Sequence, residues 1–120
     1  MAVIGKFTPD GLIAGDFPLE AQEITIVGPA DFKRGDVIGI DGDGAYALAD
    51  STATNGLQNP IGIICDNVIV GTGESKVATM YVKGEFNRRF LQFGGTDNAD
   101  IHLRRMTEIG LIIRETKIGG

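Results

Sequence analysis

The chain has 120 residues, a formal net charge of −5, 18 glycines and one cysteine. This length predicts one domain that can bury a core, and a single cysteine excludes an internal disulfide framework. The acidic balance lacks the basic excess of nucleic-acid-binding proteins, and the longest apolar run is far below the ~18 residues of a membrane helix. We therefore expect a soluble protein from a reducing compartment, with no nucleic-acid or membrane partner.

Residues 1–15 differ from the rest of the chain. Their apolar side chains are Val3, Ile4, Phe7, Leu12 and Ile13, and four glycine or proline residues interrupt any regular period. One interpretation is a frayed terminus with incidental apolar residues. The other is an arm that orders against a partner by adding a strand to its sheet.

Six short apolar runs of β type follow, each ended by a turn-forming sequence rich in Gly, Asn, Asp or Pro. The runs cover residues 24–27, 37–40, 45–48, 61–64, 68–70 and 77–82. This pattern predicts a compact barrel or clip-like β body. We expect the first two runs to form a hairpin, the last two to form another across Gly71–Ser75, and residues 50–59 to be a surface loop.

One helix is predicted, from about residue 98 to 109. Asp97 is the expected N-cap and Gly110 the C-terminal stop. The predicted core-facing stripe is Ala99, Leu103 and Met106. Leu111–Ile113 then has the character of a final buried strand.

Two glycine-rich segments superficially resemble ligand loops. Gly71–Lys76 lacks the spacing of a phosphate-binding loop and leads into a β-type run, so a hairpin turn is favoured. Asp41–Gly44 brings two carboxylates together, but the twelfth position from Asp41 is Thr52, where a calcium loop needs glutamate. A plain β-turn is favoured there.

A thiol triad could be assembled only from Cys65, Asp66 and His102. A nucleophilic thiol must be accessible and within reach of its base, whereas Cys65 lies in an apolar run and is expected to be a buried core thiol. His102 is expected away from the helical stripe. No His, Cys and carboxylate set has zinc-site spacing. We therefore predict no enzyme activity, cofactor, metal or small-molecule substrate.

Two arginine pairs, Arg88-Arg89 and Arg104-Arg105, could bind phosphates or form ion pairs within the chain or between copies. Arginine suits interface ion pairs because its planar fork binds carboxylates bidentately. Residues 1–75 carry a net charge of −8 and residues 76–120 a net charge of +3. This asymmetry suits head-to-side contact between copies, and it is equally compatible with a fold that interleaves the two halves. We expect the four arginines to form ion pairs within the chain or between copies, and they are candidate subunit-interface charges.

Three segments in succession resemble one protein family. They are Leu12–Leu19 (LIAGDFPL), Phe32–Gly39 (FKRGDVIG), and Val82–Asn87 (VKGEFN) followed by Arg105–Ile113 (RMTEIGLII). In this order and spacing they are similar to the head decoration proteins of lambda-like tailed bacteriophages. The resemblance extends from about residue 11 to residue 114.

The resemblance implies a mainly β fold: a β-clip-like compact barrel of short strands, with one short C-terminal α-helix and an extended N-terminal arm. It implies an arm over residues 1–15 and a single decoration domain over residues 16–120. It further implies a homotrimer at three-fold positions on the outer face of the expanded phage head. The implied partner is the major capsid protein, and the protein would be made in the host cytoplasm.

The expected capsid-binding residues are Phe7, Leu12, Ile13, Phe17 and Pro18. We assign no function to residues 115–120. Three alternatives stay open at this point: a small β-clip domain that binds a sugar or nucleotide, an enzyme that uses Cys65 or the Asp41/Asp43 pair, and a lipoyl- or biotinyl-type carrier. With no Trp and two Tyr residues, the first has few aromatic side chains for a binding cleft.

Overall fold

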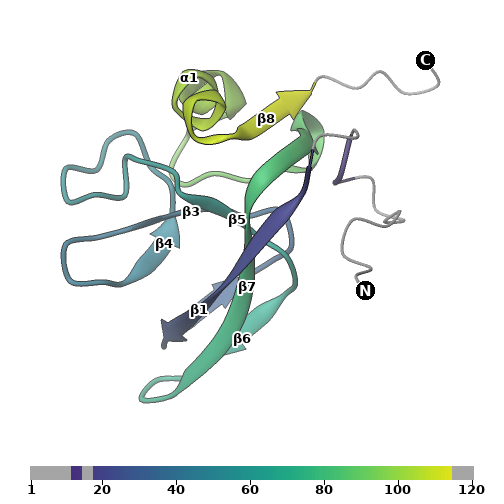
Figure 1. The fold of residues 1–120 in the computed structure, drawn as a ribbon. Helices are drawn as coiled ribbons and strands as arrows, with labels where there is room; N and C mark the ends of the chain where they lie inside the picture. Colours follow the sequence, from purple (N-terminus) through teal and green to yellow (C-terminus); the bar gives the residue numbers. More distant parts are fainter. Residues whose placement is uncertain (1–11, 15–17, 115–120) are drawn as a thin grey trace.

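The computed structural model describes residues 12–14 and 18–114 (Figure 1). Strands predominate, with one α-helix near the C-terminal end of this part, and the predicted mainly β fold is confirmed. The elements are β1 (Glu20–Val27), β2 (Ala30–Phe32), β3 (Val37–Ile40), β4 (Tyr46–Leu48), β5 (Gly62–Ile64), β6 (Val68–Val70), β7 (Ser75–Asn87), the 3-10 turn η1 (Arg88–Phe90), α1 (Ala99–Ile109) and β8 (Leu111–Arg114). No helix in the described ranges is long and apolar enough to cross a membrane.

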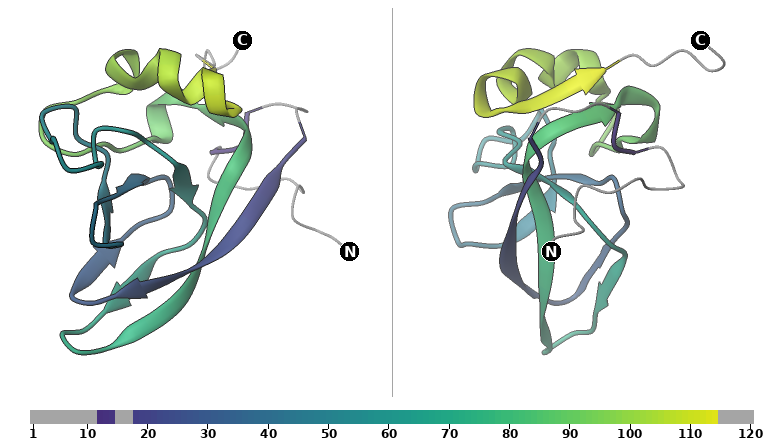
Figure 2. Two further views of the ribbon diagram at one scale, coloured as in Figure 1. Left: turned by 60° about the vertical axis from the view of Figure 1, so that its left-hand side comes forward. Right: turned by 45° about the vertical axis from the view of Figure 1, so that its right-hand side comes forward.

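The long strand β7 organises the main sheet. The strand order is β1-β7-β5-β3-β4, with antiparallel pairing throughout, and β8 pairs in parallel with the C-terminal part of β7. A separate two-stranded sheet joins β2 and β6. Figure 2 places α1 and β8 at one end of β7, and the β1–β7 ribbon extends toward the other end.

The main sheet has a hydrophobic core on each face. Successive residues of a strand point to opposite faces, and the buried neighbours Val37/Ile38 in β3, Ile63/Ile64 in β5 and Met80/Tyr81 in β7 divide between two clusters. The helix-side core consists of Leu12, Val37, Ala49, Ile63, Cys65, Tyr81, Phe86, Met106 and Leu111. The small-sheet core consists of Ile24, Ile26, Phe32, Ile38, Ile64, Val70 and Met80.

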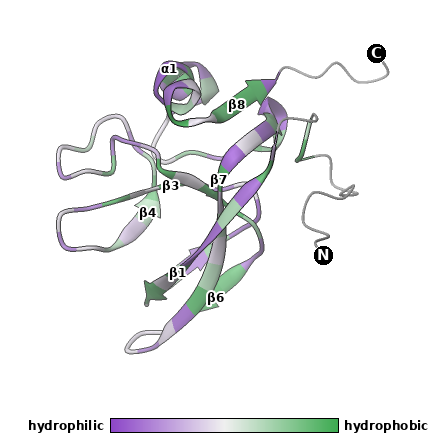
Figure 3. Cartoon of the chain, viewed as in Figure 1, coloured by the Kyte–Doolittle hydropathy of each residue, from purple (hydrophilic) through white to green (hydrophobic). Residues whose placement is uncertain are grey.

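Burial on both faces explains the continuous apolar runs of the sequence. A strand covered on both sides needs apolar residues at consecutive positions and not at every second one. The helix-side core includes residues of α1 and β8, and the small-sheet core includes residues of β2 and β6. Figure 3 shows β6 and β8 largely in the hydrophobic colour.

Both predicted hairpins are wrong in their pairing. β1 pairs with β7, about 50 residues away, and β5 and β7 lie between it and β3. The segment expected to connect the first hairpin instead contains β2, which pairs with β6. The turn at Gly71–Glu74 does form, with Glu74 N–H donating to Gly71 O at 3.0 Å. The strands on either side of it diverge because each completes a different sheet.

The helix occupies the predicted residues but has a different cap and a different buried face. Asn98 Oδ1 accepts hydrogen bonds from Asp100 N (3.0 Å) and Ile101 N (3.3 Å), so Asn98, not Asp97, is the N-cap. Gly110 ends the helix in the left-handed conformation, as predicted. The buried helical residues are Ala99, His102 and Met106. Leu103, expected in the core, is 41 % exposed, whereas His102 is 3 % exposed.

Residues 12–14 form part of the body. Ala14 N–H donates to Glu85 O at 3.0 Å and Asn87 N–H donates to Leu12 O at 2.8 Å, while Ile13 bridges Phe86. The Leu12 side chain is 1 % exposed within the helix-side core. These three residues extend the sheet along the edge of β7, and the boundary expected after residue 15 remains a prediction.

Candidate functional site

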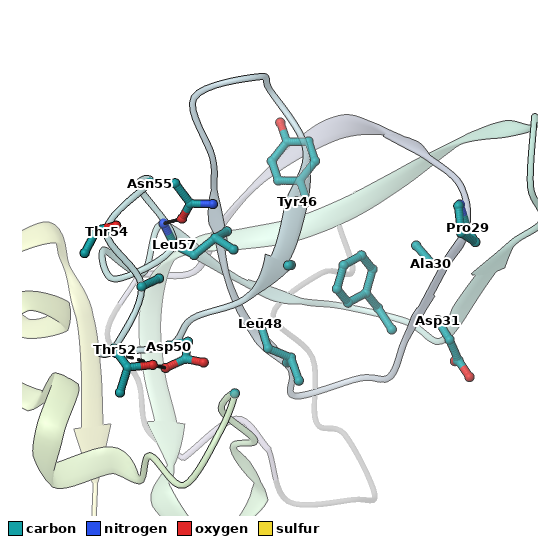
Figure 4. Close-up of a pocket in the computed structure, with 14 residues that line it drawn as sticks. Pro29, Ala30, Asp31, Tyr46, Leu48, Asp50, Thr52, Thr54, Asn55 and Leu57 are labelled. Atoms are coloured by element: carbon teal, nitrogen blue, oxygen red, sulfur yellow. Dashed lines mark hydrogen bonds between the residues drawn. The ribbon is translucent and has the colours of Figure 1, made fainter.

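An open hollow of about 640 Å³ lies between β2, β4 and the loop that follows β4 (Figure 4). It is lined by Pro29, Ala30, Asp31, Phe32, Tyr46, Ala47, Leu48, Asp50, Thr52, Ala53, Thr54, Asn55, Leu57 and Gly94. We refer to this set as the hollow. Two carboxylates and no basic side chain occur among these residues.

The turn before β4 positions the aromatic side of the hollow. Asp41 Oδ1 accepts hydrogen bonds from Asp43 N (2.8 Å) and Ala45 N (2.9 Å), and Gly44 N–H donates to Asp41 O at 3.1 Å. The β-turn expected at Asp41–Gly44 is thereby confirmed. It leads into β4, whose Tyr46 pairs with Ile40 of β3.

The loop over residues 50–59 forms a second side of the hollow and is fastened to the segment before α1. Asp97 Oδ2 accepts a hydrogen bond from Ser51 N at 2.6 Å, and Asp97 Oδ1 accepts one from Ser51 Oγ at 2.7 Å. His102 Nε2 lies 2.6 Å from Asp97 Oδ2. The His102 ring also stacks on Phe93, with ring centroids 5.1 Å apart. This network was not predicted, because no local sequence pattern links Ser51, Asp97 and His102.

The hydrogen bonds of Asp97 lower its pKa. Burial acts to raise the pKa, but hydrogen bonds from the Ser51 side chain and backbone and from His102 favour the carboxylate and outweigh that effect. The carboxylate stands between the serine and the histidine, so the histidine cannot act as base toward the serine hydroxyl. The group is therefore a structural clamp and not a Ser-His-Asp catalytic arrangement.

Much of the polar lining of the hollow is used within the chain. Asp50 Oδ1 accepts from Thr52 N (2.9 Å) and Thr52 Oγ1 (2.7 Å), and Asp31 Oδ1 lies 3.4 Å from Lys33 Nζ. Both carboxylates of the hollow therefore already have partners within the chain.

Cys65 is a buried thiol, as predicted. Burial raises its pKa to about 11. Its surroundings include Arg34, whose Nη1 donates to Cys65 O (2.7 Å) and to the Tyr81 hydroxyl (3.1 Å). His102 is instead bonded to Asp97. Cys65 and His102, which were considered together as members of a thiol triad, therefore have different partners. Within residues 12–14 and 18–114, no three His, Cys, Asp or Glu side chains are grouped to hold a metal ion.

The expected capsid-binding residues fall into three groups. Phe7 and Phe17 lie outside the described residues, and Pro18 is exposed. Ile13 is half-buried beside the helix-side core. Leu12 is a core residue whose side chain is 1 % exposed in this structure, and its expected role as a capsid contact remains a prediction.

The four candidate interface arginines also differ from one another. Arg88 Nη2 lies 2.6 Å from Asp100 Oδ1, and Arg104 Nε lies 3.5 Å from Glu108 Oε2. Arg105 is exposed. Arg89 is exposed, and its guanidinium carbon lies 5.9 Å from the centroid of the Phe90 ring. Arg88 and Arg104 thus make ion pairs within the chain, whereas Arg89 projects with an aromatic neighbour.

A comparison with known families decides the class of protein. The family model for bacteriophage lambda head decoration protein D matches residues 2–104. The chain belongs to this family of head decoration proteins. The match runs from before β1 into the first half of α1. No curated protein matches the chain.

Family membership places the chain among the structural proteins of the phage. A head decoration protein is a structural protein of the phage capsid, and the family is not known as an enzyme. The role of this decoration protein is thus structural, on the capsid of the virion.

Proposed function

We propose that this decoration protein is a capsid cement. Three copies would occupy each three-fold position on the outer face of the expanded head and hold neighbouring subunits of the major capsid protein together. Family membership over residues 2–104 is the observation that carries the proposal. The two-sided core supplies the rigid body that such a role needs, because interfaces built on a rigid support lose less entropy on binding.

We place the capsid-binding arm at residues 1–11. Leu12 is held in the helix-side core and its carbonyl accepts from Asn87 N–H at 2.8 Å, so the arm is joined to a fixed point of the body. Phe7 is its principal apolar candidate, and the exposed Pro18, with Phe17, supplies a second contact near the junction. Leu12 lies outside this arm because its side chain is buried in the helix-side core. The arm orders on the capsid, which lowers the affinity of each single contact.

Three arms on one trimer compensate for that weakness. When one arm has bound, the other two bind at a high effective concentration, so the whole trimer holds far more tightly than one arm. The partners are accordingly the major capsid protein and two further copies of this chain. Synthesis takes place in the host cytoplasm, before assembly on the head.

The test is co-sedimentation of purified variants with expanded heads. Deletion of residues 2–10 keeps Leu12 and its core contacts, and we expect unchanged thermal unfolding but no occupancy of heads. Deletion of residues 115–120 is the control, because it shortens the chain at the other end of the sequence; we expect normal occupancy. Full occupancy by the protein that lacks residues 2–10 would refute the arm.

A further inference from the structure

Arg89 and Phe90 form a small exposed projection, which we refer to as the knob. Phe90 is 37 % exposed, and Arg89 makes no ion pair with any residue of the described part of the chain. The turn that carries them is held by Asn87 Oδ1, which accepts from Arg89 N at 3.4 Å, and by Leu91 N–H, which donates to Arg88 O at 3.3 Å. Arginine and aromatic residues are enriched in the cores of protein interfaces.

The hollow complements the knob in shape and in charge. Tyr46, Leu48 and Leu57 offer half-buried apolar surface on which an aromatic ring could pack. Asp31 and Asp50 add two carboxylates that a guanidinium could meet. Asp31 already pairs with Lys33 and Asp50 with Thr52, so an incoming arginine would share these carboxylates with their partners. Complementary charges across an interface give specificity and faster association more than affinity.

The knob and the hollow are two different surfaces of the same chain. Gly94 lines the hollow and lies four residues after Phe90, so the chain between them spans at most about 14 Å. A contact between two different surfaces is head-to-side, and it closes into a ring of three when the rotation from copy to copy closes.

We propose that the knob of one copy seats in the hollow of the next copy, with Arg89 facing Asp31 and Phe90 packing beside Tyr46 and Leu48. This inference rests on the proposed trimer and assigns its contact surfaces. The partner is a second copy of this chain, because it presents an arginine–aromatic pair that suits an apolar hollow with acidic residues.

Disulfide trapping tests the contact directly. The double variant Arg89→Cys/Asp31→Cys should give covalent trimers under oxidising conditions, both on heads and in concentrated solution. The buried Cys65 remains in place in both variants. Arg89→Cys/Lys76→Cys is the control, since Lys76 is exposed on β7 and outside the hollow, and it should stay monomeric in a non-reducing gel. Absence of covalent trimers from the test variant, or covalent chains longer than three copies, would overturn the proposal.

Charge reversal tests its electrostatic part. Arg89→Glu should weaken self-association by about tenfold or more, and the further change Asp31→Arg should restore it, while Lys76→Glu, with the same change in net charge, should have no effect. Failure of the double reversal to restore association would count against the assigned pair. Trapped trimers that do not bind heads would leave this contact standing and refute the cement function instead.

Discussion

His102 Nε2 and Asp97 Oδ2 lie 2.6 Å apart, and each side chain is 3 % exposed. Because Asp97 also accepts two hydrogen bonds from Ser51, this pair joins α1 to the loop that borders the hollow. The shape of the hollow therefore depends on a contact between residues 46 positions apart in the sequence.

Substitution of Asp97 should make stability less dependent on acid pH. The pKa of Asp97 is lowered from its ordinary value of 3.8, so its contribution is present above that value and is lost as the pH falls through the lower folded-state pKa. We expect Asp97→Asn to cost about 1.5–3 kcal/mol near neutral pH and less near pH 3. Urea unfolding at both pH values measures this difference.

The matched control for that experiment is Asp43→Asn, an exposed turn residue. It should change the free energy of unfolding by less than about 0.5 kcal/mol at either pH. An equal loss for Asp97→Asn at both pH values would show that the lowered pKa does not contribute to stability.

Truncation of Leu12 should destabilise the isolated protein. The side chain is 1 % exposed in the helix-side core, and Leu→Ala at such sites costs about 2–5 kcal/mol through lost burial and a residual cavity. Chemical unfolding of Leu12→Ala and of Pro18→Ala, an exposed neighbour, measures the difference. A Leu12→Ala protein as stable as the Pro18→Ala protein would place residue 12 with the arm and not with the body.

Two glycines with positive φ should respond differently to alanine. Gly35 has φ +100°, and an added Cβ would overlap the carbonyl oxygen of Phe90. Gly73 has φ +80° and no atom within 4 Å of such a Cβ. We expect Gly73→Ala to cost about 1–2 kcal/mol from backbone strain alone, and Gly35→Ala about 1–3 kcal/mol more from the overlap.

Thermal unfolding of the two variants tests this ranking. Gly35→Ala should in addition weaken self-association, because the displaced carbonyl belongs to the knob, whereas Gly73→Ala should associate normally. Equal stability of the two variants would contradict the close packing of Gly35 against Phe90.

Cys65 should react slowly with thiol reagents in the folded protein. Burial raises its pKa to about 11, so near pH 8 only about one thiol in a thousand is ionised. Labelling in the native state should be at least about a hundredfold slower than in urea. Thr54→Cys in a Cys65→Ala background provides an exposed thiol as the control, on the loop over residues 50–59. Equal labelling rates for the native and unfolded protein would show that the thiol is accessible.

Local features of this chain were predictable because neighbouring residues decide them. The β-turn at Asp41–Gly44 follows from short-range hydrogen bonds of Asp41, and the end of α1 follows from the conformational freedom of Gly110. The apolar runs likewise indicated strands, since consecutive β-type apolar residues favour a sheet buried on both faces.

The tertiary structure alone decided which strands pair and which polar residues are buried. β1 finds its partner about 50 residues away, and no short-range pattern encodes that choice, because several runs carry equivalent apolar faces. His102 can be buried because its ring bonds to Asp97 and stacks on Phe93. The sequence placed Leu12 in an arm, because the core site that buries it, formed with Phe86 and Met106, exists only in the folded chain.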